Sequence, residues 1–302
     1  MRSRHSFLHW FKPEQWLFFA RLLAVGGRAF LRNNGPSWAA AIAYYSLLSI
    51  FPLLLAAGSV ASYFIDPQWA VLKVTALLGD FLPKGRVAIE AVVKETLEGG
   101  GVGLLFFLPM IWTGTLVFGA LTKALNIAFQ GTNHRSYLRQ MKVRLIMLLS
   151  LGVIFGLALG SSTLLRVIQA TVGILPVGGE FLLALLRGVA PTLLLLLGFL
   201  LTYRFVPAKR PGWRAAWVGA SVASLAFVIA KPVFLGYVQV LARYNFVYGS
   251  LGGIIAAVIW AWVVSMIGIF GGQITWLWQC VVVDGESLEV VERRCLSRQH
   301  KP

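Results

Sequence analysis

The chain has 302 residues, 58% of them hydrophobic, and a mean hydropathy of +0.77. Soluble domains average ~45–50% apolar residues, so we expect one membrane domain to use nearly all of the chain. A formal net charge of +16 would indicate nucleic-acid binding in a soluble protein. In a membrane protein the same excess is expected of cytoplasmic loops facing anionic lipid, so no nucleic-acid partner is expected.

Six apolar runs are separated by charged gaps, near residues 38–64, 102–122, 143–165, 188–206, 215–237 and 251–279. About 20 residues rising 1.5 Å each cross the hydrocarbon core, so each run predicts one transmembrane helix. None of the 11 acidic residues lies in a run, and of the 27 Lys and Arg only Lys231 lies clearly within one. The sequence therefore predicts an all-α, polytopic membrane protein with six transmembrane helices over residues 37–279.

Lys and Arg are distributed unequally between alternate gaps. They total 19 in the N-terminal segment, in 123–144, in 204–214 and after 279, against 7 in the intervening gaps. Because cytoplasmic loops carry the Lys and Arg excess, both termini are predicted to be cytoplasmic.

The segments outside the spans carry patterns of their own. Residues 1–36 form a basic cytoplasmic segment, in which a predicted amphipathic helix over 14–32 either lies along the membrane surface or extends the first span inward. Residues 66–100 are predicted to hold extracytoplasmic amphipathic helices, and the one over 84–98 either caps the outer mouth or packs only for stability. The cytoplasmic charged tail is residues 280–302, and its acidic residues are interpreted as a solvated helix face: Asp284, Glu286, Glu289 and Glu292.

Polar and helix-breaking residues are costly at membrane depth, which makes them candidates for a transport pathway. The first span contains such a cluster in Tyr44, Tyr45, Ser46, Ser49 and Pro52. A proline lacks an N–H and frees the carbonyl four residues earlier, here beside hydroxyl groups that can hydrogen-bond. The cluster predicts either a gate or cavity lining, or helix packing in which serine bonds the preceding turn.

The fifth span contains Lys231 followed by Pro232. An ammonium at the bilayer centre costs ~2.5–3.5 kcal/mol, which indicates a partner or a function. Lys231 also lies close enough to the outer end of the span for its long side chain to reach the outer interface. An anionic-ligand role and simple snorkelling therefore both stay open.

Further candidates lie around the last span. For Tyr244, Asn245 and Tyr248 the choice is between an interfacial anchor and ligand contact. Trp260 and Trp262 lie deeper, where an indole N–H needs an acceptor. Small residues four apart let helices approach closely, so seven glycines are predicted to pack helices: Gly152, Gly156, Gly160, Gly249, Gly253, Gly268 and Gly272.

Enzyme motifs are missing from the sequence. The four histidines, at 5, 9, 134 and 300, are not at metal-ligand spacing with one another or with the cysteines, and no serine-nucleophile or phosphate-binding loop is present. We expect no catalytic residue, metal or cofactor. The expected partners are the lipid bilayer with its anionic phospholipids, and a homo-oligomer is an open possibility.

The run from Ala43 to Leu55, AYYSLLSIFPLLL, resembles the opening signature of the YihY/BrkB family of bacterial inner-membrane proteins. Further family positions follow in order: Trp112 with Lys123 and Asn126, Pro211-Gly212, Gly219-Ala220, and Tyr248-Gly249-Ser250-Leu251. The resemblance covers roughly residues 37–279. It implies a multi-pass protein of the bacterial inner membrane, with six spans and cytoplasmic termini.

The resemblance implies little about activity. Members were once labelled ribonuclease BN, and others are linked to virulence and serum resistance. Where the family often ends its last span with Gly-Ala-Glu, this chain has Gly271-Gly272-Gln273, and a glutamine there can preserve a hydrogen bond. The leading hypothesis is a passive or gradient-driven transporter of an anionic amphiphile such as a lipid. A non-catalytic scaffold for envelope machinery is the alternative, and a membrane-bound ribonuclease is a third.

Overall fold

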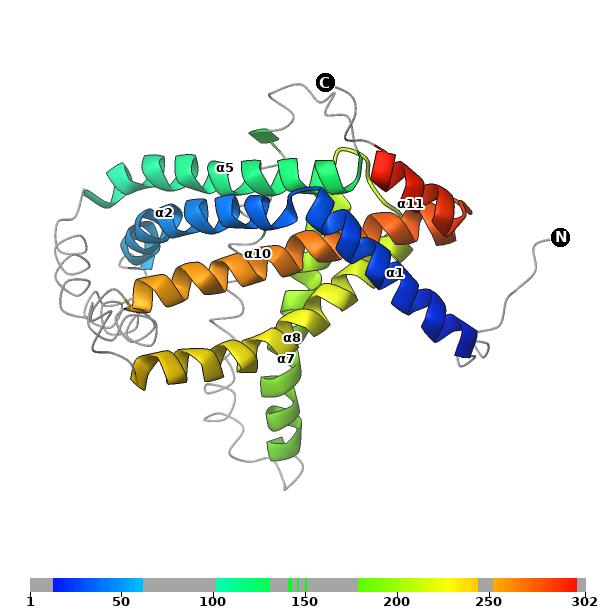
Figure 1. The fold of residues 1–302 in the computed structure, drawn as a ribbon. Helices are drawn as coiled ribbons and strands as arrows, with labels where there is room; N and C mark the ends of the chain where they lie inside the picture. Colours follow the sequence, from blue (N-terminus) through cyan, green and yellow to red (C-terminus); the bar gives the residue numbers. More distant parts are fainter. Residues whose placement is uncertain are drawn as a thin grey trace.

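The computed structural model describes residues 13–61, 102–130, 179–243 and 252–297, together with 141, 142, 146 and 150. Every regular element in these residues is a helix (Figure 1), which agrees with the predicted all-α class. The elements are α1 (Pro13–Arg32), α2 (Gly35–Ala61), α5 (Val102–Ala128), α7 (Gly179–Phe205), α8 (Trp213–Arg243), α10 (Gly252–Trp278), the π-helix η3 (Gln279–Val283) and α11 (Leu288–Ser297).

Five of the six predicted spans correspond to described helices, namely α2, α5, α7, α8 and α10. Two stretches, Trp213–Gln239 and Ile255–Val283, are long and apolar enough to cross a membrane, and Thr115–Ala128 and Pro191–Phe205 are shorter apolar helices. The helices therefore fit a membrane protein. The span predicted over 143–165 and the amphipathic helices predicted over 66–100 lie outside the described residues.

The central helix of the described bundle is α10, which contacts α2 on one side and α8 on the other (Figure 1). Helix α5 packs on α2, and α7 packs on α8. Helix α1 crosses the C-terminal half of α10 and also contacts α11. We call the end of the bundle with α1, α11 and the α7–α8 loop the α1 end, and the opposite end, where α2 and α8 finish and α10 begins, the far end.

A sharp elbow separates α1 from α2. Asn34 adopts a φ of +54°, a left-handed conformation that asparagine tolerates better than most residues. Pro36 then occupies the first turn of α2, where its missing N–H costs nothing. The helix predicted over 14–32 is thus a separate element, α1, and not a straight extension of α2.

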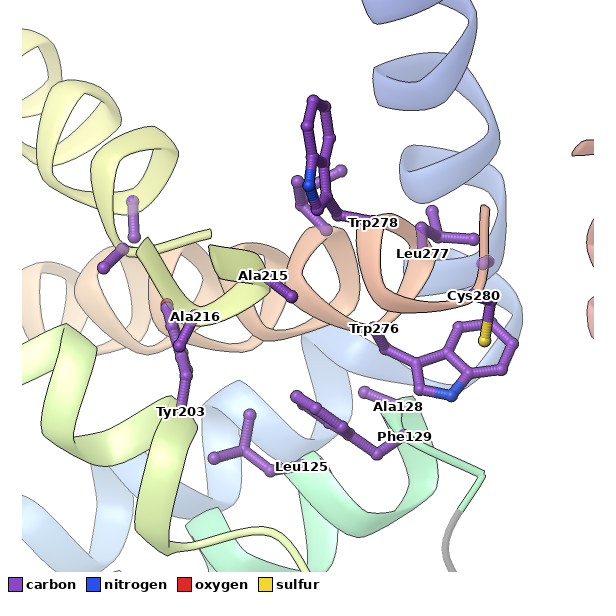
Figure 2. Close-up of a cluster of buried hydrophobic side chains, with 14 of the residues drawn as sticks. Leu125, Ala128, Phe129, Tyr203, Ala215, Ala216, Trp276, Leu277, Trp278 and Cys280 are labelled. Carbon is purple, nitrogen blue, oxygen red and sulfur yellow. The ribbon is translucent and has the colours of Figure 1, made fainter. Parts of the chain in front are cut away.

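Burial is distributed unevenly along the bundle. In α10, each residue from Ile255 to Ile267 is partly exposed, whereas from Gly268 to Trp278 all are buried except the partly buried Phe270. In α8, buried residues end at Ser224, and none of the residues from Leu225 to Gln239 is buried. The side chains of the main core, including Leu125, Tyr203 and Trp276, belong to the α1 end (Figure 2). Within the described residues, buried side chains of α8 and α10 are therefore concentrated at the α1 end, and the far parts of both helices are partly buried or exposed.

Candidate functional site

The α8–α10 contact at the α1 end depends on two facing glycines. A Cβ on Gly219 would overlap the Thr275 hydroxyl and come within 2.5 Å of the Gly271 carbonyl oxygen. A Cβ on Gly271 would overlap the Tyr203 hydroxyl and lie 2.7 Å from the Cβ of Ala223. Because backbone atoms are among these neighbours, only glycine allows this approach of the two helices.

Three buried hydroxyl groups in this region bond to helix carbonyls, whereas the buried Ser224 Oγ has no hydrogen-bond partner in the described residues. Tyr203 Oη donates to the Gly268 carbonyl oxygen at 2.8 Å, which connects α7 to α10. Thr275 Oγ1 donates to the Gly271 carbonyl oxygen at 2.9 Å, and Thr202 Oγ1 donates to that of Gly198 at 2.7 Å. These bonds satisfy the three hydroxyl groups within the packed end of the bundle.

Gln273 lies on α10 and faces the α1–α2 elbow. It is only 1% exposed, and its Oε1 accepts a hydrogen bond from Asn33 Nδ2 at 3.1 Å. Its Nε2 is buried without a hydrogen-bond partner. The glutamine thus makes the hydrogen bond anticipated for this position, and the amide pair connects the elbow to the central helix.

Two further side chains hold the α7–α8 loop in place. Asn126 Oδ1 of α5 accepts from the backbone N–H of Ala208 at 2.7 Å. Gln279 Oε1 accepts from the N–H of Gly212 at 2.8 Å, while its Nε2 donates to Asp284 Oδ1 at 2.8 Å. The loop is therefore fixed to α5 on one side and to η3 on the other.

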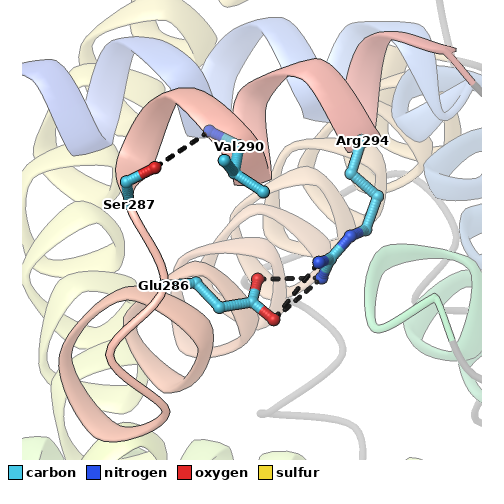
Figure 3. Close-up of polar contacts among 4 residues, drawn as sticks. All are labelled: Glu286, Ser287, Val290 and Arg294. Carbon is cyan, nitrogen blue, oxygen red and sulfur yellow. Dashed lines mark hydrogen bonds and ion pairs between the residues drawn. The ribbon is translucent and has the colours of Figure 1, made fainter.

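The acidic residues of the tail are not simply a solvated helix face. Glu292 Oε1 forms an ion pair with Arg28 Nη1 of α1 at 2.7 Å. Glu286 pairs with Arg294 at 2.8 Å, and Ser287 accepts a bond from the N–H of Val290 at 3.4 Å at the start of α11 (Figure 3). The tail thus folds against α1: Glu286 and Glu292 are partly buried and ion-paired, whereas Asp284 and Glu289 are exposed, as a solvated face expects.

The candidate cluster in α2 is divided between surface and core. Tyr44 is exposed and its ring lies 5.6 Å from that of Tyr45, which packs against buried residues. Ser46 is partly buried, and Ser49 Oγ donates to its carbonyl oxygen at 2.9 Å. Pro52 lies within α2. The Ser49 hydroxyl therefore bonds the preceding turn, as the packing interpretation of this cluster expects.

Lys231 and Pro232 are both exposed on the open part of α8. Around them the exposed large side chains are apolar, including Val228, Ile229 and Val233. On the neighbouring helix, the Trp260 ring stacks on Phe234 with centroids 4.7 Å apart. Lys231 is thus a cation on an apolar helix surface, next to a region where aromatic rings join α8 to α10.

Other predicted positions are placed as follows. Trp262 Nε1 donates to the Pro36 carbonyl oxygen at 3.1 Å, so this indole has the acceptor that its depth requires. A Cβ on Gly272 would overlap Leu125, whereas one on Gly268 would meet only Phe199 at 3.7 Å. Gly253 lies in the first turn of α10. Seven predicted residues lie outside the described part: Gly152, Gly156, Gly160, Tyr244, Asn245, Tyr248 and Gly249.

Within the described residues, no group of three or more His, Cys, Asp or Glu side chains could hold a metal ion. At the α1 end the structure instead brings together two polar side chains and two glycines of facing helices. We call this group the junction: Asn33, Gly219, Gly271 and Gln273. The Lys231 surface lies apart from that junction, further along α8.

The sequence pattern that defines the virulence factor BrkB family matches residues 27–289, which is most of the chain. The chain belongs to the BrkB family. This membership confirms the resemblance found at the motifs of the first and last spans and identifies the chain as a bacterial membrane protein.

Relatives within the BrkB family share just under a third of the aligned residues with this chain. The ribonuclease-like protein YfkH of Bacillus subtilis is 30% identical over 254 residues, which cover 80% of this chain and 89% of YfkH. A UPF0761 membrane protein of Tolumonas auensis is 30% identical over 84% of each chain. Another, from Rhodospirillum centenum, is 29% identical over 82% of this chain but only 54% of its own length. No solved structure matches the chain.

The sequence did not identify several of the residues at the junction. In the sequence Gly219 stands out only as part of the family motif Gly219-Ala220, and Asn33 is not among the candidate residues. The spacing of residues in the sequence does not show which helix Gly219 or Asn33 will face, because the partner of each lies more than 50 residues away in the chain. Gln273 was singled out by its departure from the family pattern.

Proposed function

We propose that this BrkB-family protein is a passive or gradient-driven transporter of an anionic amphiphile such as a lipid. In this proposal it spans the bacterial inner membrane six times, both termini are cytoplasmic, and the α1 end faces the cytoplasm. The observation that carries the proposal is the unequal burial along α8 and α10, whose side chains are buried at the α1 end and only partly buried or exposed toward the far end. Such an arrangement is expected of a pathway open to one side of the membrane.

In this proposal, Lys231 makes the exposed surface of α8 selective for an anionic ligand. A cation within an apolar helix surface is costly in lipid, and an anionic headgroup would offset that cost while an acyl chain lies along Val228, Ile229 and Val233. The predicted spans contain no acidic residue, so the usual carboxylate carriers of protons or sodium ions are missing there. Movement down the gradient of the amphiphile itself is therefore the proposed driving force.

Replacing Lys231 by methionine keeps an unbranched side chain, one atom shorter, and removes its charge. We expect the full chain in liposomes to move a fluorescent anionic phospholipid between leaflets, and Lys231→Met to slow that movement at least tenfold. The matched control is Lys123→Met, which removes an exposed lysine from α5. Equal rates for wild type, Lys231→Met and empty liposomes would contradict the transport proposal.

A non-catalytic scaffold is the second candidate, favoured by the compact α1 end. There the ion pair between Arg28 and Glu292 attaches the tail to α1, so these two elements present one surface. A scaffold predicts that deleting residues 284–302 abolishes the cellular phenotype, while replacing Tyr44, Ser46 and Lys231 leaves it intact. The opposite pattern would support transport.

We propose that the protein is not an enzyme. The ribonuclease-like name belongs to YfkH. Purified protein is expected to leave RNA intact with or without divalent metal ions. RNA cleavage that persists through successive purification steps and scales with the amount of this protein would overturn this part of the proposal.

A further inference from the structure

The α7–α8 loop at the α1 end gathers four cationic side chains within a short stretch. Arg204 is in the last turn of α7, Lys209 and Arg210 are in the loop, and Arg214 is in the first turn of α8. No Asp or Glu occurs in the sequence between Glu180 and Asp284. None of the four forms an ion pair with an acid in the described residues, although Asp284 is held near the loop through Gln279.

Aromatic rings fix two of these guanidinium groups. Arg204 lies over the Trp213 ring at 5.2 Å, and Arg210 lies over the Phe205 ring at 5.9 Å. The Phe205 and Trp213 rings are themselves edge to face, with centroids 6.2 Å apart. Arg204 Nη1 donates to the Pro211 carbonyl oxygen, but its Nε is buried with no hydrogen-bond partner. The two stacked guanidiniums are therefore held in place, and one of them has a donor without an acceptor.

The backbone beneath the cations is also held in place. Asn126 and Gln279 bond the loop at Ala208 and Gly212, and Pro207 and Pro211 are buried. Because the loop is anchored from both sides, an anion that binds here loses little free energy in ordering it.

Two tryptophans indicate how deep the cationic α7–α8 loop lies in the membrane. Trp213 and Trp217 are four residues apart on α8 and are 49% and 48% exposed. Exposed tryptophans at the end of an apolar helix are typical of the headgroup layer of a bilayer. Lys209, Arg210 and Arg214 are exposed beside them, at the level where lipid phosphates lie.

We propose that Arg204, Lys209, Arg210 and Arg214, bordered by Trp213 and Trp217, form a binding site for the phosphate group of an anionic phospholipid. We call it the α7–α8 phosphate site. The lipid belongs to the leaflet at the α1 end, and its acyl chains lie along the exposed apolar side of α8. This site is at the opposite end of α8 from the Lys231 surface and does not depend on the proposed transport.

The test measures phospholipid retained by the detergent-purified full chain, by native mass spectrometry. Wild-type protein is expected to retain phosphatidylglycerol in preference to phosphatidylcholine. Lys209→Gln/Arg214→Gln removes two exposed charges that have no described hydrogen bond, so the fold should persist, which an unchanged thermal midpoint would verify. Each lost cation is expected to weaken retention about fivefold, and the pair roughly 25-fold.

The matched control is Arg21→Gln/Arg293→Gln, which removes two exposed cations from the same end of the bundle. We expect less than a twofold change for this pair. Equal losses in the two double variants would show a general attraction to positive charge and overturn the site. Equal retention of the two phospholipids by wild type would do the same, as would displacement of the lipid by equimolar inorganic phosphate.

Discussion

Replacing Gly219 by alanine is expected to lower the free energy of unfolding by about 3 kcal/mol, at the upper end of the range for overpacked cores. The added methyl group would overlap the Thr275 hydroxyl and come within 2.5 Å of the Gly271 carbonyl oxygen. A hydroxyl can rotate away, but a backbone carbonyl can yield only if α8 and α10 separate. The thermal midpoint of purified protein in detergent would report the change.

Gly236→Ala on the same helix is the matched control. A Cβ at this position has no neighbouring atom within 4 Å, and alanine favours a helix over glycine by about 1 kcal/mol. The two substitutions add the same methyl group to α8, yet their effects should have opposite signs. If both variants unfolded at the wild-type midpoint, the close approach of α8 and α10 would not contribute to stability.

The helices were predictable from the sequence because long apolar runs between charged gaps leave few alternatives in a membrane protein. The five runs that fall in the described residues are all helical, with boundaries that shift by up to nine residues, as for α7. Three elements that carry Lys or Arg, namely α1, the α7–α8 loop and α11, lie at the same end of the bundle (Figure 1), while the orientation of that end in the membrane stays a prediction.

The contacts between helices were much less predictable. The spacing of Gly268 and Gly272 indicates a packing face of α10, but it does not identify Gly219 as the residue that meets Gly271. Charge pattern alone likewise could not show that Glu292 reaches Arg28 of α1, since the tail and α1 are separated by most of the chain. Such contacts depend on crossing angles and on the rotation of each helix, which a one-dimensional pattern does not fix.

Asn33→Leu is expected to lower the free energy of unfolding by about 1–3 kcal/mol, the cost of leaving a buried polar group without its partner. Gln273 is 1% exposed and its Nε2 already lacks a partner, so loss of the Asn33 bond would leave the whole amide unsatisfied. The substitution also tests how firmly the α1–α2 elbow is attached to α10. Thermal unfolding and protease cleavage between α1 and α2 would measure the two effects.

The double variant Asn33→Leu/Gln273→Leu makes this prediction specific to the amide pair. Removing both polar groups together is expected to restore most of the lost stability, because no buried donor or acceptor then lacks a partner. A cavity or strain introduced by the leucine that replaces Asn33 would instead persist in the double variant. If the stability lost in the double variant equalled the sum of the losses in the two single variants, the amides would not interact. Gln273 would then be retained for a reason other than its bond to Asn33.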